Sequence, residues 1–87
     1  MNYKATGKEM PELLADLQFA KLSMDRVVLR RIVKAMDSLT GNAEFTDSES
    51  KDWRRLSSAA IRESNMLAVP KHCAAILAFW HRYQRAA

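Results

Sequence analysis

The sequence contains very few of the residues that turn or cross-link a chain. Its 87 residues include two glycines, two prolines and one cysteine. So few turn-forming residues favour long helices over many short strands. A single cysteine excludes an internal disulfide and is typical of a reducing compartment. Two glycines are also too few for a glycine-rich phosphate-binding loop.

Long hydrophobic runs are also missing. No stretch is long and apolar enough to cross a bilayer, and the first ten residues, MNYKATGKEM, lack the apolar segment of a signal peptide. We therefore expect a cytoplasmic protein that does not contact a membrane. The content of 48% hydrophobic and 28% charged residues is that of a globular chain. At this length we expect one domain with a modest core.

The periodicity of apolar residues predicts an all-α, compact four-helix domain over residues 10–87. The expected helices are a short one at about 11–21, two longer ones at about 23–39 and 47–68, and an aromatic-rich C-terminal helix at about 70–85. Residues 1–9 show no periodicity and are expected to form a flexible arm.

The segment 23–39 has the clearest sequence signals for the start, the end and the apolar face of a helix. Ser23 is expected to be its N-cap, and Gly41 the left-handed residue beyond its end. Its apolar residues recur at helical spacing. Its cations Arg26, Arg30 and Lys34 are spaced by four, so they form one stripe. The stripe is either ordinary solvated surface or a surface for an anionic partner.

The third segment begins with a capping-box pattern, in which Thr46 is followed three residues later by Glu49. Phe45, just before it, is expected to pack back as a hydrophobic staple. The apolar seam of this helix is expected to contain four residues: Trp53, Leu56, Ala60 and Leu67.

Catalytic and metal-binding patterns are weak, and we expect no enzyme activity, no cofactor and no metal. His72 and Cys73 are adjacent, so on a helix they point in different directions. His72 and His81 are nine residues apart, which is not the spacing of a helical metal-binding pair. Cys73 on an apolar face is expected to be a small buried hydrophobic residue.

The net charge of +4 and the pI of about 9.6 permit a nucleic acid or another acidic partner without requiring one. Aromatics beside arginines are typical of protein interfaces. The expected partner-binding residues combine the basic stripe with the end of the last helix: Arg26, Arg30, Arg31, Lys34, Trp80, Tyr83, Arg82 and Arg85.

These residues suggest a regulatory or inhibitory protein that docks a basic and aromatic helical surface on a protein or nucleoprotein partner. A phage- or plasmid-encoded modulator of a host complex would be a protein of this kind. The alternative is a small DNA-binding transcriptional regulator, in which segments 11–21 and 23–39 form a helix-turn-helix-like pair. Homodimerisation through the last helix is a further possibility.

The order of elements resembles that of the Hha-type regulators, which act with nucleoid proteins. The resemblance lies in a short helix, a basic helix, an acidic loop that opens a long helix (FTDSES…WRRLSSAA) and a Pro-started, Trp-containing end. It implies an all-α regulator without catalytic activity. The last helix is longer here, and no residue roles are carried over.

Overall fold

The all-α prediction is confirmed by the computed structural model, which describes residues 3–42 and 45–86, except the side chains of residues 42 and 84–86. The described residues form four α-helices and no strand. The helices are α1 (Met10–Ser23), α2 (Arg26–Leu39), α3 (Asp47–Arg62) and α4 (Val69–Ala86). Two short 3₁₀ helices, η1 (Thr40–Asn42) and η2 (Met66–Ala68), follow α2 and precede α4.

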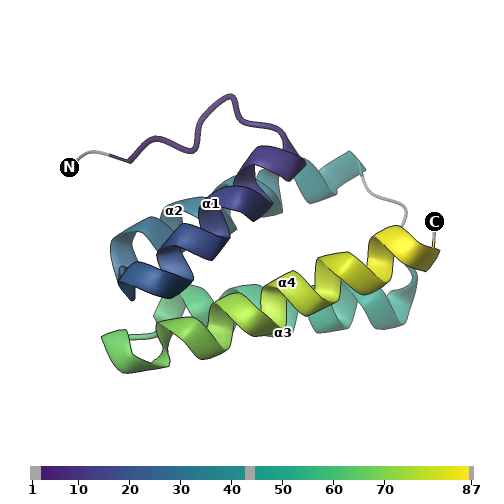
Figure 1. Ribbon diagram of the computed structural model, residues 1–87. Coiled ribbons are helices and arrows are strands. Elements are labelled where there is room, and N and C mark those ends of the chain that lie inside the picture. Colours follow the sequence, from purple (N-terminus) through teal and green to yellow (C-terminus); the bar gives the residue numbers. More distant parts are fainter. Residues whose placement is uncertain (1–2, 43–44, 87) are drawn as a thin grey trace.

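The helices form two layers, with α1 and α2 above α3 and α4 (Figure 1). Helices α1 and α3 each pack against both α2 and α4. The apolar faces of all four therefore meet in one core between the layers. Its fully buried side chains come mainly from α1, α2 and α4: Leu13, Leu17, Leu29, Ile32, Val33, Met36, Val69, Cys73 and Ile76.

Helices α1 and α2 are separate, and the prediction that Ser23 is the N-cap of the second helix was wrong. Met24 adopts a left-handed conformation with φ of 54° and ends α1. Ser23 belongs to α1, where its hydroxyl donates to the carbonyl of Phe19 at 2.9 Å. Asp25 is the N-cap of α2 and accepts the backbone N–H groups of Val27 and Val28 at 3.0 and 3.1 Å. A carboxylate suits this position because it also complements the positive end of the helix dipole.

The C-terminal end of α2 also differs from the prediction. The helix ends at Leu39, as expected, but Thr40 follows in a right-handed conformation with φ of −70°. Gly41 lies within η1, and its φ is not positive. The chain therefore continues into a tighter helical turn, which needs no left-handed glycine.

The predicted capping box of α3 is confirmed. Thr46 Oγ1 accepts the N–H of Glu49 at 3.1 Å, and Glu49 Oε1 accepts the N–H of Thr46 at 2.8 Å. The predicted end near residue 68 was wrong, because α3 stops at Arg62 and Glu63 is extended.

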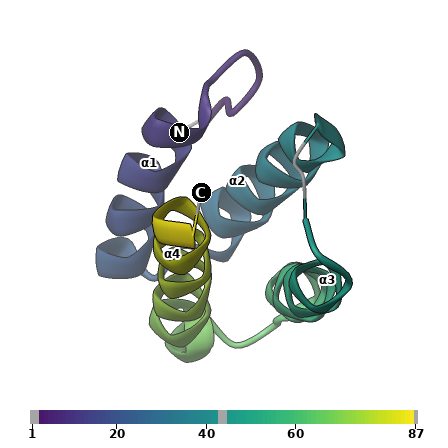
Figure 2. The ribbon, with the colours of Figure 1, turned by 90° about the vertical axis from the view of Figure 1, so that its right-hand side faces the viewer.

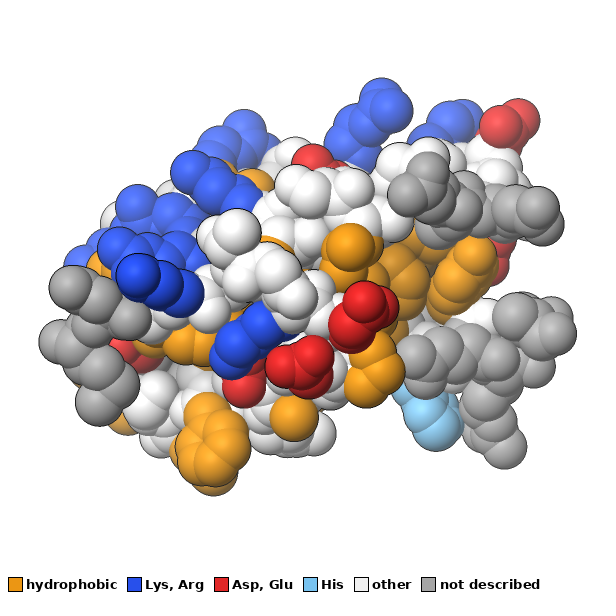
Figure 3. Space-filling view, turned by 90° about the horizontal axis from the view of Figure 1, so that it is seen from above, with side chains coloured by type: hydrophobic (Ala, Val, Ile, Leu, Met, Phe, Trp, Pro, Cys, Tyr) orange, Lys and Arg blue, Asp and Glu red, His pale blue; other side chains and the backbone are white. Residues whose placement is uncertain are grey.

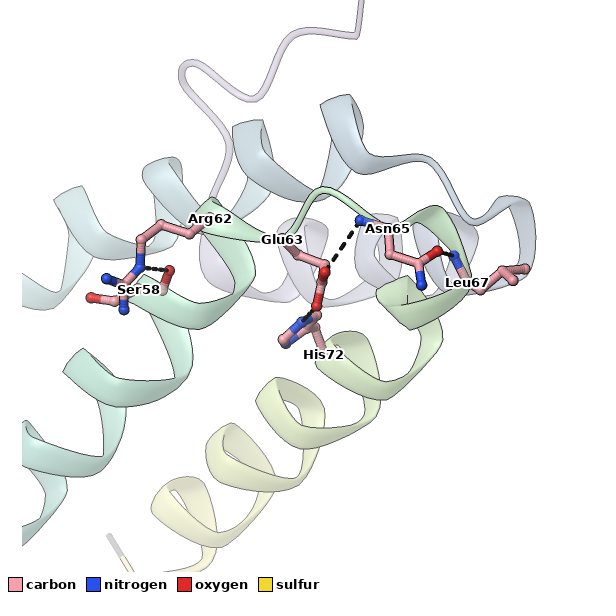
Figure 4. A network of polar contacts seen from close by, with 6 residues as sticks. All are labelled: Ser58, Arg62, Glu63, Asn65, Leu67 and His72. Atoms are coloured by element: carbon pink, nitrogen blue, oxygen red, sulfur yellow. Dashed lines mark hydrogen bonds and ion pairs between the residues drawn. The ribbon is translucent and has the colours of Figure 1, made fainter.

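Side-chain hydrogen bonds hold the connection between α3 and α4 (Figure 4). One carboxylate oxygen of Glu63 lies 2.8 Å from Nε2 of His72, and the other accepts the N–H of Asn65 at 3.2 Å. Asn65 in turn accepts the N–H of Leu67 at 3.0 Å. Leu67 is 71% exposed, so it is not part of the apolar seam of α3.

Mutation can decide whether Ser23 or Asp25 caps α2. Asp25→Ala should lower the free energy of unfolding by about 1 kcal/mol, because two N–H groups lose their acceptor. Ser23→Ala should change it by less than about 0.5 kcal/mol, since the Ser23 hydroxyl only supplements a helix carbonyl at the surface. Urea denaturation followed by circular dichroism measures both variants. A larger loss in Ser23→Ala would contradict the cap assignment.

Candidate functional site

One face of α2 packs into the core, and the opposite face is exposed to solvent. Four residues face the core and are at most 1% exposed: Leu29, Ile32, Val33 and Met36. On the opposite side Val27, Arg31, Lys34 and Ser38 are all exposed. They follow one another at intervals of four and three residues, so they form one row along the helix. This strong segregation makes α2 the most clearly amphipathic of the helices.

The predicted basic stripe lies beside this row. Arg26 and Arg30 are half-buried at the edge of the row. The Nε–H of Arg30 is buried and has no acceptor among the described residues. Lys4 of the N-terminal arm lines the same groove as Arg31 and Lys34. We call these five cations the basic face: Lys4, Arg26, Arg30, Arg31 and Lys34.

The two carboxylates of α2 do not neutralise the basic face. Asp25 caps the helix, and Asp37 accepts the indole N–H of Trp53 at 3.0 Å. Within the described residues, the ion pairs are Lys8–Asp16, Arg55–Asp52 and His72–Glu63, none of which includes a cation of the basic face. Seen from above, lysine and arginine side chains gather toward the end of the molecule where α2 begins (Figure 3, left).

The N-terminal segment, predicted to be a flexible arm, lies against α1 and α2 from residue 3 onward. The Tyr3 hydroxyl and the Lys8 ammonium group both donate to Asp16 Oδ2 of α1 at 2.6 Å. Arg31 of α2 donates through Nη1 to the carbonyl of Tyr3 at 2.6 Å. Ala5 between them is buried. Residues 1 and 2 lie outside the described chain.

These contacts change the proton affinity of the two groups that hold the arm. Burial by itself would raise the pKa of Asp16, but the hydrogen bonds from Lys8 and Tyr3 outweigh it and lower this pKa below its ordinary value. Burial and the hydrogen bond to Asp16 raise the pKa of the Tyr3 hydroxyl. The arm is therefore held by an ionised Asp16 and a protonated Tyr3 at neutral pH.

A groove of about 740 Å³ lies between the arm and α2. Residues 3–9 form one wall, and the C-terminal half of α2 forms the other. Figure 2 shows the arm looping out between α1 and α2, on the side away from α3 and α4. A second, smaller groove of about 420 Å³ lies between α2 and α3.

The prediction of Trp80 as an exposed aromatic anchor was wrong, because Trp80 packs in the core. Trp80 is only 3% exposed, and its ring centroid lies 5.2 Å from that of Trp53 of α3. Tyr83 is half-buried, with its ring centroid 4.9 Å from that of Phe45. Phe45, expected to pack on its own helix, thus packs against α4. Trp80 therefore offers no free ring to a partner, and Tyr83 is only partly exposed.

Of the remaining predicted cations, Arg82 is not part of the basic face. Arg82 is exposed near the C-terminal end of α4, which lies at the opposite end of the molecule from the start of α2 (Figure 1). The side chain of Arg85 lies outside the described residues.

Exposed apolar side chains are the surface feature that sequence reasoning missed. Phe19 and Leu22 of α1 are 73% and 80% exposed, and Met66 of η2 is 50% exposed. The buried face of α1 consists of Leu13, Leu17 and Ala20, and Phe19 and Leu22 lie outside it.

Cys73 is fully buried in α4, and burial raises the pKa of its thiol to about 11. The protonated thiol is a poor nucleophile at neutral pH. Among the described residues, no group of three or more His, Cys, Asp or Glu side chains is placed to hold a metal ion. Nor does any described helix combine the length and the apolar character of a membrane span.

Comparison of this chain with models of protein families, with curated proteins and with solved structures finds no match. The resemblance to Hha-type regulators therefore rests only on the order of elements along the sequence.

The arm contact should depend on pH. Because the folded-state pKa of Asp16 is lowered, its contribution to stability is present above the unfolded value of about 3.9 and is lost as pH falls through the folded value. Asp16→Asn should lower the free energy of unfolding by about 1 kcal/mol at about pH 6 and should change it much less at about pH 3.

Urea titrations at the two pH values measure this difference. The matched control is Glu63→Gln. The pKa of Glu63 is also lowered, mainly by its hydrogen bond with His72, but Glu63 lies outside the arm. Cleavage of the arm by a protease should increase in Asp16→Asn and not in Glu63→Gln. Equal cleavage of both variants would contradict the role of Asp16.

Proposed function

We propose that the protein is a small non-enzymatic regulator that docks its basic face on the phosphate backbone of a nucleic acid, free or within a nucleoprotein complex. The observation that carries the proposal is the group of cations on α2 and the arm, which form no ion pair with the described carboxylates. The phosphates of a nucleic acid hold condensed counterions. Protein cations that contact the phosphates release these ions, and the release favours the complex.

A nucleic acid suits this face better than an apolar pocket on a protein. With Trp80 and Tyr83 packed into the core, the exposed row of α2 offers one apolar side chain, Val27, beside Arg31 and Lys34. Protein interfaces of high affinity usually depend on a buried aromatic or arginine anchor surrounded by apolar contacts. Phosphate recognition needs cations and no such anchor.

Binding of this kind is consistent with a regulatory or inhibitory role that needs no catalysis. By occupying phosphates that a larger complex would use, a small protein can compete with that complex directly. The burial of Cys73 supports a role without a nucleophile. The modest net charge of +4 suits a protein that binds reversibly at moderate salt.

A second candidate is a sequence-specific DNA-binding regulator in which α1 and α2 act as a helix-turn-helix-like pair. It is favoured by the short connection at Met24 and Asp25 and by exposed Val27 and Arg31 near the start of α2. Recognition helices contact bases from this part of the helix. This candidate differs from backbone docking because a selected duplex would bind far more tightly than unselected duplexes at the same salt.

The backbone proposal predicts a steep salt dependence. Between about 50 mM and about 200 mM salt, the affinity for a duplex should fall along a line in log–log coordinates. The triple variant Arg30→Gln, Arg31→Gln, Lys34→Gln should weaken binding at least about tenfold and should reduce the slope by about three, one for each phosphate contact. Fluorescence anisotropy with a labelled duplex measures both quantities.

A matched control removes the same charge from the outer side of α3. Lys51, Arg55 and Arg62 are exposed there. Their triple replacement by Gln should leave the slope almost unchanged. If both triple variants lowered affinity and slope equally, binding would depend on net charge and the basic face would not be the docking surface.

A further inference from the structure

The groove between the arm and α2 has features that a flat phosphate-contacting surface does not need. Its volume of about 740 Å³ lies within the range of roughly 300–1,000 Å³ that is usual for small-molecule sites. The walls come from segments far apart in the sequence, and the contact between Arg31 and the Tyr3 carbonyl joins them. The groove is therefore a product of the tertiary structure.

Positive charge dominates the walls of the groove. Lys4, Arg31 and Lys34 line it without an ion pair to any described carboxylate. The fourth cation, Lys8, is neutralised by Asp16. Glu9 is the acidic side chain among the lining residues. The walls thus have an excess of two unpaired positive charges, which suits an anion with more than one negative charge.

One of these cations is held in position before any ligand arrives. Arg31 uses Nη1 to bind the Tyr3 carbonyl at 2.6 Å, and Tyr3 is itself held by Asp16. The guanidinium group has five N–H donors in a planar fork, so most of them remain for a ligand. An arginine that is already oriented loses less side-chain entropy when it binds a phosphate.

The groove also offers apolar surface next to its cations. Ala35 and Leu39 lie on α2 one turn apart, and Leu39 is 38% exposed. Ala5 on the arm side is buried. A ligand with a phosphate and a flat, partly apolar ring could contact both kinds of surface. Free inorganic phosphate would use only the cations.

We propose that this groove binds a phosphomonoester of nucleotide size, with the phosphate at Arg31 and Lys34 and the base against Ala35 and Leu39. A phosphomonoester has a charge of about −1.5 to −2 at neutral pH, which matches the excess positive charge of the walls. A groove of about 740 Å³ has room for a ligand of nucleotide size and not for a duplex. The ligand is therefore either a free nucleotide or the phosphorylated end of a single strand.

The two sources have different relations to the function proposed above. A strand end would extend nucleic-acid docking, and this version rests on that proposed function. A free nucleotide would be a separate effector. Because Lys4, Arg31 and Lys34 belong to both the groove and the basic face, the two proposals are separated by residues that belong to only one of them. Ser38 lines the groove and is not part of the basic face, whereas Arg26 and Arg30 belong to the basic face and do not line the groove.

Isothermal titration calorimetry with adenosine monophosphate, adenosine and inorganic phosphate tests the proposal on the full chain. Adenosine monophosphate should bind at least about tenfold more tightly than either of its parts, since it alone uses both surfaces. Ser38→Trp, which fills the groove, and Lys4→Gln should each weaken this binding at least about tenfold. Arg26→Gln, Arg30→Gln should leave it unchanged while weakening duplex binding.

The source is distinguished by a short single strand with and without a 5′ phosphate. Tighter binding of the phosphorylated strand, lost in Ser38→Trp, would identify a strand end, and binding of the mononucleotide alone would identify a free effector. The proposal is overturned if neither ligand binds, or if Ser38→Trp and Lys4→Gln bind as the unaltered protein does. Duplex binding of the double variant Arg26→Gln, Arg30→Gln tests the basic face, and nucleotide binding of Ser38→Trp tests the groove. Either proposal can therefore fail without the other.

Discussion

The packing of aromatic rings between α3 and α4 is the interaction on which the rest of the structure depends. Phe79 and Trp80 of α4 meet Trp53 of α3 with ring centroids 5.2 to 5.6 Å apart, and Phe45 and Tyr83 close one end of the cluster. Each large ring removes more apolar area from water than an aliphatic side chain. In a domain of 87 residues, such rings supply much of the available core.

Because these aromatic side chains are packed in the core, the groups left on the outer row of α2 for a partner are mainly cations. Trp53 also donates its indole N–H to Asp37, so the same cluster ties α3 to α2 and occupies a carboxylate that would otherwise lie near the cations. Asp25 is occupied at the helix start. The outer row of α2 is left with uncompensated cations. The outer row of α2 therefore presents mainly charge to a partner, while the aromatic rings of α3 and α4 serve the fold.

The N-terminal arm is joined to α1 and α2 by hydrogen bonds and so forms part of this surface. Tyr3, Lys8 and Asp16 form one polar cluster, and Arg31 links that cluster to α2. Because the arm is short and lacks secondary structure, these few bonds and the buried Ala5 provide its described contacts. Changes at Asp16 should therefore affect the groove more than they affect the four helices.

Sequence reasoning predicted most of the fold because local rules govern it. The capping box at Thr46 and the helical spacing of apolar residues in α2 depend on residues a few positions apart. The capping box was predicted correctly, and among the apolar residues of α2 Leu29, Ile32, Val33 and Met36 are buried whereas Leu39 is 38% exposed. The boundary between α1 and α2 was not, since Ser23 and Asp25 are both good caps, and only the left-handed Met24 decides between them. The end of α3 depends on the contact of Glu63 with His72, nine residues away.

The candidate site was only partly predictable for the same reason. The cations of α2 were identified from their spacing, and the structure places Arg31 and Lys34 at the surface. Trp80 was misplaced because apolar residues cover more than half of the last helix, so periodicity could not say which side packs inward. The groove was missed because Arg31 and Tyr3 are 28 positions apart.

The most direct test of the central claim is acrylamide quenching of the two tryptophans with and without a DNA duplex. Trp53 and Trp80 are 4% and 3% exposed. We predict blue-shifted emission and weak quenching in the free protein, both unchanged when the duplex binds. Red-shifted, readily quenched emission that becomes shielded on binding would contradict the account, because it would place an aromatic ring in the interface instead of the core.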